Sequence, residues 1–253
     1  MPAACAAEKL SRSDAIATVC DAKLIKGGTM NLADGTPRGR GGVYVASNAT
    51  LNIADGVIEG GDSTETAMGA YGIYASDQEN EEANRVVITG GEILGGMRAG
   101  AGPGGVGRGQ SIFVEGGGTV DVYGGKIGDK LTGNVMDVEA GFFGNLTSGN
   151  NVATVNIYGG HWKGSTIWLY SYNNAEAYLN IYGDLKKTPD TNANQSQYSV
   201  EGHLCDGSSF KQTITVDTVN ANPLTVSSDC SGFTAKPTYE DDCGSGKKKS
   251  RRL

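Results

Sequence analysis

The chain has 253 residues, 40 of them glycine, and a formal net charge of −7 at pH 7. Glycine does not recur at every third position, which excludes collagen, and the acidic balance argues against nucleic acid as a general partner. No stretch approaches 18 consecutive apolar residues, so no membrane-spanning helix is predicted.

The first 21 residues are predicted to form an N-terminal cap. Within residues 6–20, Leu10, Ile16 and Val19 recur near the helical period, which predicts a short helix. Such a helix would cover the open first coil of a stacked structure and protect its edge from other chains. Residues 1–7 are too short to be a signal peptide, so secretion would need a leader that this chain lacks.

A repeated phrase dominates the next two hundred residues. It reads threonine, apolar, asparagine or aspartate, apolar, then a small or aromatic residue and glycine, which predicts a strand followed by a sharp turn. Its copies start between 21 and 35 residues apart, at Thr29, Thr50, Arg85, Thr119, Thr154, Tyr178 and, in degraded form, Thr213. Short apolar strands precede most copies, at 43–45, 73–75, 112–114, 136–138, 167–169 and 198–200. Units of this length must stack on their neighbours to bury an apolar face, as in a solenoid.

We therefore predict an all-β fold, a parallel β-helix over residues 22–230. Strands ~4.8 Å apart would give it about six or seven coils along a rod roughly 30 Å long. Residues 231–253 lose the pattern and are predicted to be an acidic and basic disordered tail. A twisted β-sandwich is the alternative, but a sandwich does not need a repeated phrase.

The phrase resembles the repeats of the pectin-lyase-like superfamily of right-handed β-helices, nearest to Gly-rich surface adhesins. The resemblance is carried by units such as Gly41-Gly42-Val43-Tyr44-Val45 followed by Thr50-Leu51-Asn52-Ile53. It implies a fold rather than an activity, because the superfamily contains lyases, hydrolases, epimerases and non-catalytic adhesins.

Alternation along each copy predicts rows of outward side chains. Tyr123, Tyr158 and Tyr182 lie beside Asp121, Asn156 and Asn180, and together they are our candidate glycan-binding platform. The alternative is that like residues stack only to stabilise the solenoid. A third row, Glu92, Lys126, His161 and Asp184, alternates in charge and is expected to pair with itself.

The preceding strands carry a second aromatic row. It consists of Tyr44, Tyr74, Phe113 and Trp168, interrupted by Asp137. This row could be a ligand groove, a subunit interface, or the surface beneath the capping helix or the Gly-rich insertion at 96–109. The insertion itself is predicted to be mobile.

Catalysis is not the favoured prediction. A calcium-dependent lyase would need clustered carboxylates near a base, which Asp121, Asp137 and Glu139 with Lys126 only approximate. A glycosidase would need two facing carboxylates, and Asp137 and Glu139 are the one close pair of carboxylates on a strand face. Two histidines are too few for a three-histidine zinc site, and no other metal site or cofactor is predicted, although Ca²⁺ remains possible at the acidic loop 77–82.

Secretion is favoured by two features. Cysteines fall only near the ends of the chain, with Cys5, Cys20, Cys205 and Cys230 as disulfide candidates and Cys243 as the odd residue. Glycosylation sequons start at Asn48, Asn145 and Asn194. We therefore expect an extracellular or cell-surface protein.

The leading hypothesis is a non-catalytic module that binds polysaccharide or associates with itself, for adhesion or as part of a wall or appendage. One alternative is a polysaccharide lyase or glycoside hydrolase. The other is an ice-binding protein, suggested by the outward threonines Thr29, Thr50, Thr119 and Thr154.

Overall fold

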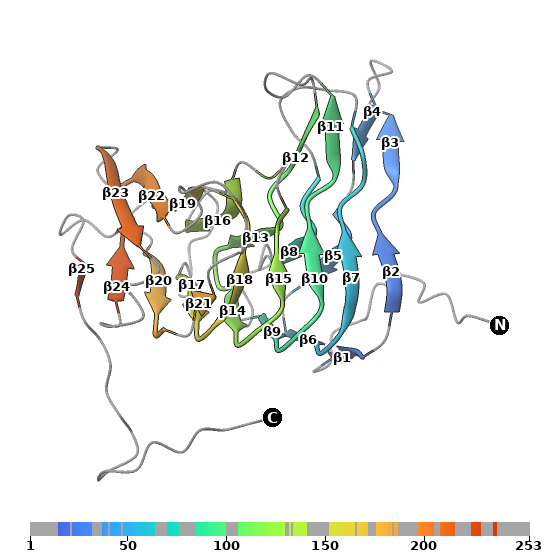
Figure 1. Ribbon diagram of the computed structural model, residues 1–253, viewed down its shortest axis with the longest axis horizontal. Helices are drawn as coiled ribbons and strands as arrows, with labels where there is room; N and C mark the ends of the chain where they lie inside the picture. Colours follow the sequence, from blue (N-terminus) through green and yellow to red (C-terminus); the bar gives the residue numbers. More distant parts are fainter. Residues whose placement is uncertain are drawn as a thin grey trace, which may run out of the picture.

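The computed structural model is all-β, and the part of the chain that it describes contains no helix. It describes residues 15–20, 22–31, 37–39, 41–46, 48–63, 70–75, 84–99, 106–129, 132, 134–140, 152–164, 166–171, 176–183, 185–186, 197–204, 208–215, 224–228 and 235–236. Three long sheets run side by side along the molecule (Figure 1).

Sheet 1 contains eight strands and carries the repeated phrase. In spatial order they are β1 (Ala15–Val19), β6 (Ala49–Ile53), β9 (Arg85–Ile88), β14 (Thr119–Val122), β17 (Ala153–Ile157), β20 (Ala177–Ile181), β24 (Leu224–Ser227) and β25 (Ala235–Lys236). The pairs from β1 to β20 are parallel, whereas β24 and β25 pair antiparallel.

Sheet 2 contains six strands and sheet 3 contains seven. Sheet 2 is built from β2 (Ala22–Lys26), β7 (Gly56–Glu59), β10 (Glu92–Leu94), β15 (Lys126–Ile127), β18 (Gly160–Trp162) and β21 (Leu185–Lys186). Sheet 3 is built from β5 (Val43–Val45), β8 (Ile73–Ala75), β13 (Ile112–Glu115), β16 (Asn134–Ala140), β19 (Thr166–Ser171), β22 (Gln197–His203) and β23 (Ser209–Thr215). Only the last pair of sheet 3, β22 with β23, is antiparallel.

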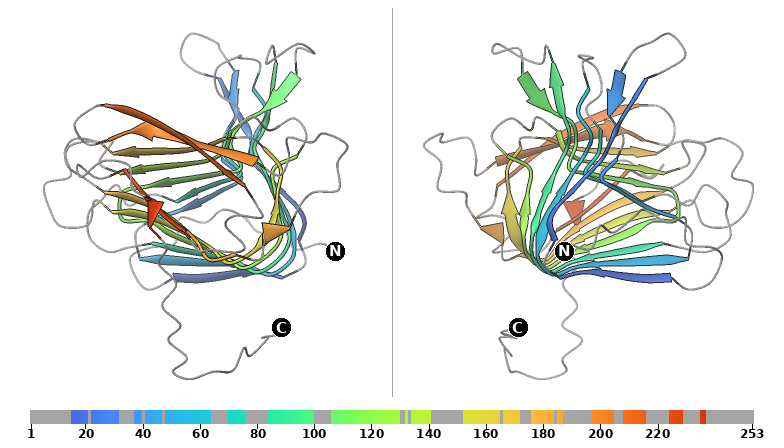
Figure 2. Two further views of the ribbon diagram at one scale, coloured as in Figure 1. Left: turned by 60° about the vertical axis from the view of Figure 1, so that its left-hand side comes forward. Right: turned by 90° about the vertical axis from the view of Figure 1, so that its right-hand side faces the viewer.

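The chain visits the three sheets in turn, and this makes the molecule a parallel β-solenoid. One turn passes through β6, β7 and β8, and the next begins at β9. Figure 2 shows the sheets facing one another around a common interior. The right-handed sense and the count of about six or seven coils stay predictions, because several connecting segments lie outside the described residues.

The interior is apolar because alternate residues of every strand point into it. The inward residues stack on like residues of the next strand, as Ile53 does on Ile88 and Val120 on Val155. From sheet 2, Trp162 fills part of the same core. Since β-branched side chains dominate these positions, local strand propensity and core packing favour the same structure.

The predicted N-terminal helix is wrong for its C-terminal part. Residues 15–19 form β1, which pairs in parallel with β6, so Ile16 lies beside Thr50. Three of the five residues in Ala-Ile-Ala-Thr-Val are β-branched, and the neighbouring edge of β6 supplies hydrogen bonds that a helix would have to make internally. Residues 6–14 lie outside the described part of the chain.

Two of the seven predicted copies of the repeated phrase lie outside the parallel part of sheet 1. Thr29 begins β3 (Thr29–Asn31), which pairs antiparallel with β4 (Pro37–Gly39) in a hairpin outside sheet 1. Thr213 lies in β23 of sheet 3. The five middle copies share one register, from Thr50 through Arg85, Thr119 and Thr154 to Tyr178. The threonine row invoked for ice binding therefore lacks Thr29.

The Gly-rich insertion contains a second hairpin, formed by β11 (Met97–Ala99) and β12 (Val106–Arg108). Arg108, whose side chain is only 13% exposed, holds its base to the solenoid. Its guanidinium donates to Glu59 at 2.8 Å, to Asp129 at 2.5 Å and to the carbonyl of Gly95 at 2.9 Å. These contacts tie the base of the hairpin to β7 and to the turn after β15, and the predicted mobility of the insertion stays a prediction.

In the predicted tail, β25 adds a two-residue strand to sheet 1. The helix-free described part of the chain offers no helix that could span a membrane.

Candidate functional site

The tyrosine row lies where sheet 1 turns into sheet 2. Tyr123, Tyr158 and Tyr182 each follow the last residue of a sheet 1 strand, and each backbone N–H donates to the strand before, which extends the register past the strand end. The row is therefore positioned by the backbone of three consecutive coils.

The three rings are stacked face to face. Ring centroids are 4.5 Å apart between Tyr123 and Tyr158 and 4.6 Å apart between Tyr158 and Tyr182, and both pairs are within 5° of parallel. On the β9 side, the row continues with Thr89 and Ala54, which carry no ring. Tyr123 is accordingly 47% exposed, with one face open. A ligand can reach this open face and the ring edges, but not the faces between the rings.

A polar row runs beside the tyrosines across sheet 1. Arg85 donates to Asp121 at 2.8 Å through Nε, and Asn156 donates to the second oxygen of the same carboxylate at 2.8 Å. Asn180 donates to Asn156 at 2.8 Å, and Thr225 donates to Asn180 at 2.7 Å. Asp121 is 3% exposed, so its carboxylate serves this row and is not presented to a ligand.

Stacking changes the acidity of the middle tyrosine. Burial, together with the neighbouring hydroxyls of Tyr182 and Tyr123, raises the pKa of Tyr158 to about 12. Because a tyrosine in an unfolded chain titrates near 10, the native state holds this proton more tightly than the unfolded state does. The stabilising effect is complete below pH 10 and is lost as pH rises towards 12.

We expect this difference to be visible in an alkaline titration followed by tyrosinate absorbance. The folded protein should retain one late-titrating tyrosine that Tyr158→Phe removes, and the loss of stability between pH 10 and 12 should become less steep in that variant. If Tyr158→Phe instead removes a tyrosine that titrates near pH 10, the stack does not shield Tyr158.

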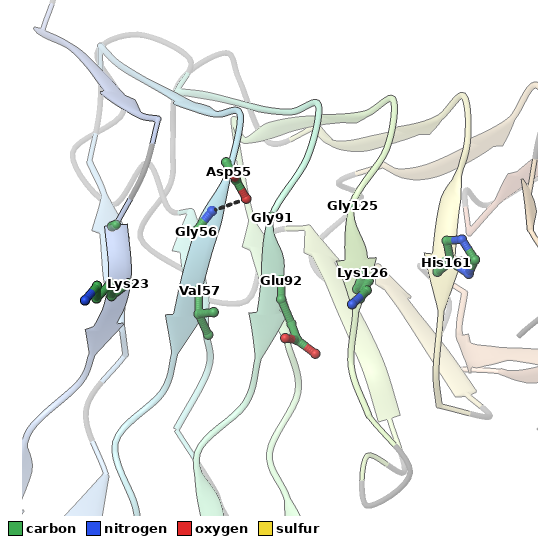
Figure 3. A pocket seen from close by; sticks show the side chains of 10 residues that line it. Lys23, Asp55, Gly56, Val57, Gly91, Glu92, Gly125, Lys126 and His161 are labelled. Carbon is green, nitrogen blue, oxygen red and sulfur yellow. Dashed lines mark hydrogen bonds between the residues drawn. The ribbon is translucent and has the colours of Figure 1, made fainter.

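Across the turn, sheet 2 carries a shallow groove of about 490 Å³ (Figure 3). Gly56, Gly91 and Gly125 line one side, and charged side chains stand along the strands. The groove is lined by Ala22, Lys23, Asp55, Gly56, Val57, Gly91, Glu92, Gly125, Lys126 and His161. Asp55 caps its own turn, since its carboxylate accepts from the N–H of Gly56 at 2.7 Å.

The predicted charge pairing along this groove is not found. Glu92 lies beside Lys126 in register, and Figure 3 shows the two side chains on neighbouring strands, yet they form no ion pair within 4.0 Å. The register also places Lys186, not Asp184, beside His161. The residue beside His161 therefore lies two positions further along the chain than the sequence alignment assumed.

The second aromatic row follows one register position of sheet 3. Tyr44 lies 5.3 Å from Tyr74, and Tyr74 lies 5.0 Å from Phe113, measured between ring centroids. Phe113 is buried and stacks on Tyr71 at 4.5 Å, a residue that the alternation did not flag because it precedes its strand. Asp137 and then Trp168 continue the register, and Trp168 contacts Tyr170.

Glu115 was missed by sequence reasoning. It is 2% exposed at the end of β13, and the Tyr74 hydroxyl donates to its carboxylate at 2.5 Å. It lies beside Glu139 in register. The side chains of Asp137 and Glu139 lie outside the described residues, so the paired-carboxylate prediction is not tested.

The structure describes only some of the other residues that the sequence predicted as sites. Asn48 lies in a turn with a φ of 61°, whereas Asn145 and Asn194 lie outside the described residues. Cys20 is exposed and forms no disulfide, and Cys5, Cys205, Cys230 and Cys243 lie outside, so the pairing stays a prediction. Among the described side chains, no group of three or more His, Cys, Asp or Glu could hold a metal ion.

Comparison with known proteins gives no family. No protein-family model matches the chain, and no curated protein or solved structure matches it significantly. The functional argument therefore rests on the surfaces described above.

Proposed function

We propose that this chain is a non-catalytic, extracellular β-solenoid module that binds glycans for adhesion or surface structure. The tyrosine row carries the proposal, because three aromatic side chains are held rigidly on the outside with their edges and the open face of Tyr123 accessible. The resemblance of the repeat to Gly-rich surface adhesins supports the same class.

The row suits a sugar chain for physical reasons. Stacked rings have already lost their rotational freedom, so binding to them costs little conformational entropy. Sugar C–H groups can pack on the open face of Tyr123, and phenolic hydroxyls can exchange hydrogen bonds with sugar hydroxyls.

The polar row has a supporting part in this proposal. Asn156 and Asn180 each use one amide hydrogen within the row, which leaves the second hydrogen of each amide for a ligand. Asp121 positions Asn156 and Arg85 instead of contacting sugar. This differs from the direct role that the sequence suggested for Asp121.

The test is a glycan array followed by affinity measurement on the best binder. Tyr123→Ala and the double variant Tyr158→Ala with Tyr182→Ala should each weaken binding about tenfold or more, as expected for an anchoring aromatic residue. Unfolding midpoints should change little for Tyr123→Ala, since its ring is half exposed.

Tyr44→Ala is the matched control, because Tyr44 is 52% exposed and lies on sheet 3. It should leave affinity unchanged. An array without any binder, or an equal loss in the Tyr44 variant, would refute the proposed role of the tyrosine row.

A further inference from the structure

We infer that the glycan is sulfated and that sheet 2 binds its sulfate groups through Lys126, which lines the groove, and Lys163, which lies just after β18 and outside the groove lining. This rests on the proposed glycan binding and assigns the chemical class of the ligand.

The first argument is the state of the lysines. The structure describes five lysine side chains, of which Lys26 pairs with Asp62 at 2.9 Å and Lys211 pairs with Glu201 at 2.9 Å. The side chains of Lys23, Lys126 and Lys163 form no hydrogen bond or ion pair. In a protein with a net charge of −7, all three of these unpaired lysines lie on or directly beside sheet 2.

The second argument is their arrangement. Lys126, His161 and Lys186 occupy one register position on the consecutive strands β15, β18 and β21, and Lys163 follows β18 on the same outward side as His161. Neighbouring strands lie ~4.8 Å apart, so this row repeats cationic or titratable residues along the solenoid axis. A linear chain with regularly spaced anions would lie along it.

The third argument is the floor of the groove. Gly56, Gly91 and Gly125 have φ values of 100°, 79° and 88°. A Cβ at Gly125 would meet the carbonyl oxygen of Gly90 at 2.8 Å, so stacking itself requires glycine there. In the coil of β14 and β15, only Gly124 and Gly125 separate Tyr123 from Lys126, so a ligand can contact both across a turn without side chains.

Two observations select sulfate on a glycan over other anions. The cationic side chains of the row are lysines, whose ammonium groups bind tetrahedral oxyanions as point charges, without the planar bidentate geometry with which guanidinium binds carboxylates and phosphates alike. A long nucleic acid would meet the acidic remainder of the surface. A sulfated sugar chain uses both the cationic row and the adjoining aromatic row.

The experiment compares a sulfated glycosaminoglycan oligosaccharide with its chemically desulfated counterpart, by calorimetry at several salt concentrations. Lys126→Ala combined with Lys163→Ala should weaken binding of the sulfated probe about three- to tenfold and reduce its salt dependence. The same double variant should bind the desulfated probe as tightly as the unsubstituted protein does. Glu92→Gln should strengthen binding of the sulfated probe, because it removes the carboxylate of the row.

Lys211→Ala is the matched control, since this lysine is exposed but ion-paired on sheet 3, and it should change nothing. Equal binding of both probes, unaffected by the lysine variants, would overturn the sulfate assignment and leave glycan binding in place. Equal binding of polyphosphate or single-stranded DNA would also overturn it, as a general attraction for polyanions. Failure of every glycan would refute the proposed function itself.

Discussion

Replacing Trp162 with alanine should lower the free energy of unfolding by about 3–5 kcal/mol, the usual cost of removing a buried tryptophan. Trp162 is 2% exposed, contacts the apolar core from sheet 2, and donates its indole N–H to the carbonyl of Gly159 at 3.2 Å. The solenoid interior cannot collapse around the cavity, because each strand is fixed by hydrogen bonds on both sides.

The chain supplies its own control for this prediction. Its second tryptophan, Trp168, points outward from sheet 3 and is only half-buried, so Trp168→Ala should cost clearly less. Urea unfolding followed by far-UV circular dichroism compares the two without relying on tryptophan fluorescence. Equal losses would mean that the core does not close around Trp162 as described.

Arg85→Ala should cost about 2–3 kcal/mol, below the full cost of breaking a buried ion pair because the arginine itself is half exposed. The substitution leaves the carboxylate of Asp121, which is 3% exposed, with Asn156 as its one remaining partner in the polar row. The penalty comes from a buried charge that has lost its counterion.

A double-mutant cycle isolates this cause. Asp121→Asn removes the charge but keeps an oxygen that can accept from Asn156, so adding it to Arg85→Ala should recover part of the lost stability. If the two losses simply add, then Arg85 stabilises the protein by packing and not through the charge of Asp121.

The sequence predicted the middle of the solenoid well because the physical constraints there are local and repeated. Alternation sets which residues point inward, and one shared register then fixes the outward rows. This is why Tyr123, Tyr158 and Tyr182 were correctly aligned from the sequence.

The ends were predicted less well because the phrase alone does not show which sheet a strand joins. Thr29 and Thr213 match the phrase but lie in antiparallel pairs, whereas residues 15–19 match it poorly yet pair with β6. Partner choice depends on edges that only the folded neighbours provide.

Side-chain partners were harder still to predict. Nothing in the spacing of Glu92 and Lys126 shows that they form no ion pair, and the two-residue shift before β21 is visible only in the register. Similarly, Glu115 follows an apolar strand and reads as solvent-exposed, but aromatic residues from the preceding coil help to bury it.

The antiparallel strands at the C-terminal end give the solenoid a polarity. The parallel stacking ends at β20 in sheet 1 and at β22 in sheet 3, each of which has a parallel neighbour on one side and an antiparallel neighbour on the other. The final strands of sheets 1 and 2, β25 and β21, are also only two residues long. Among the described strands, this end of sheets 1 and 2 therefore offers only short edges, which limits the backbone available for edge-to-edge pairing with another chain.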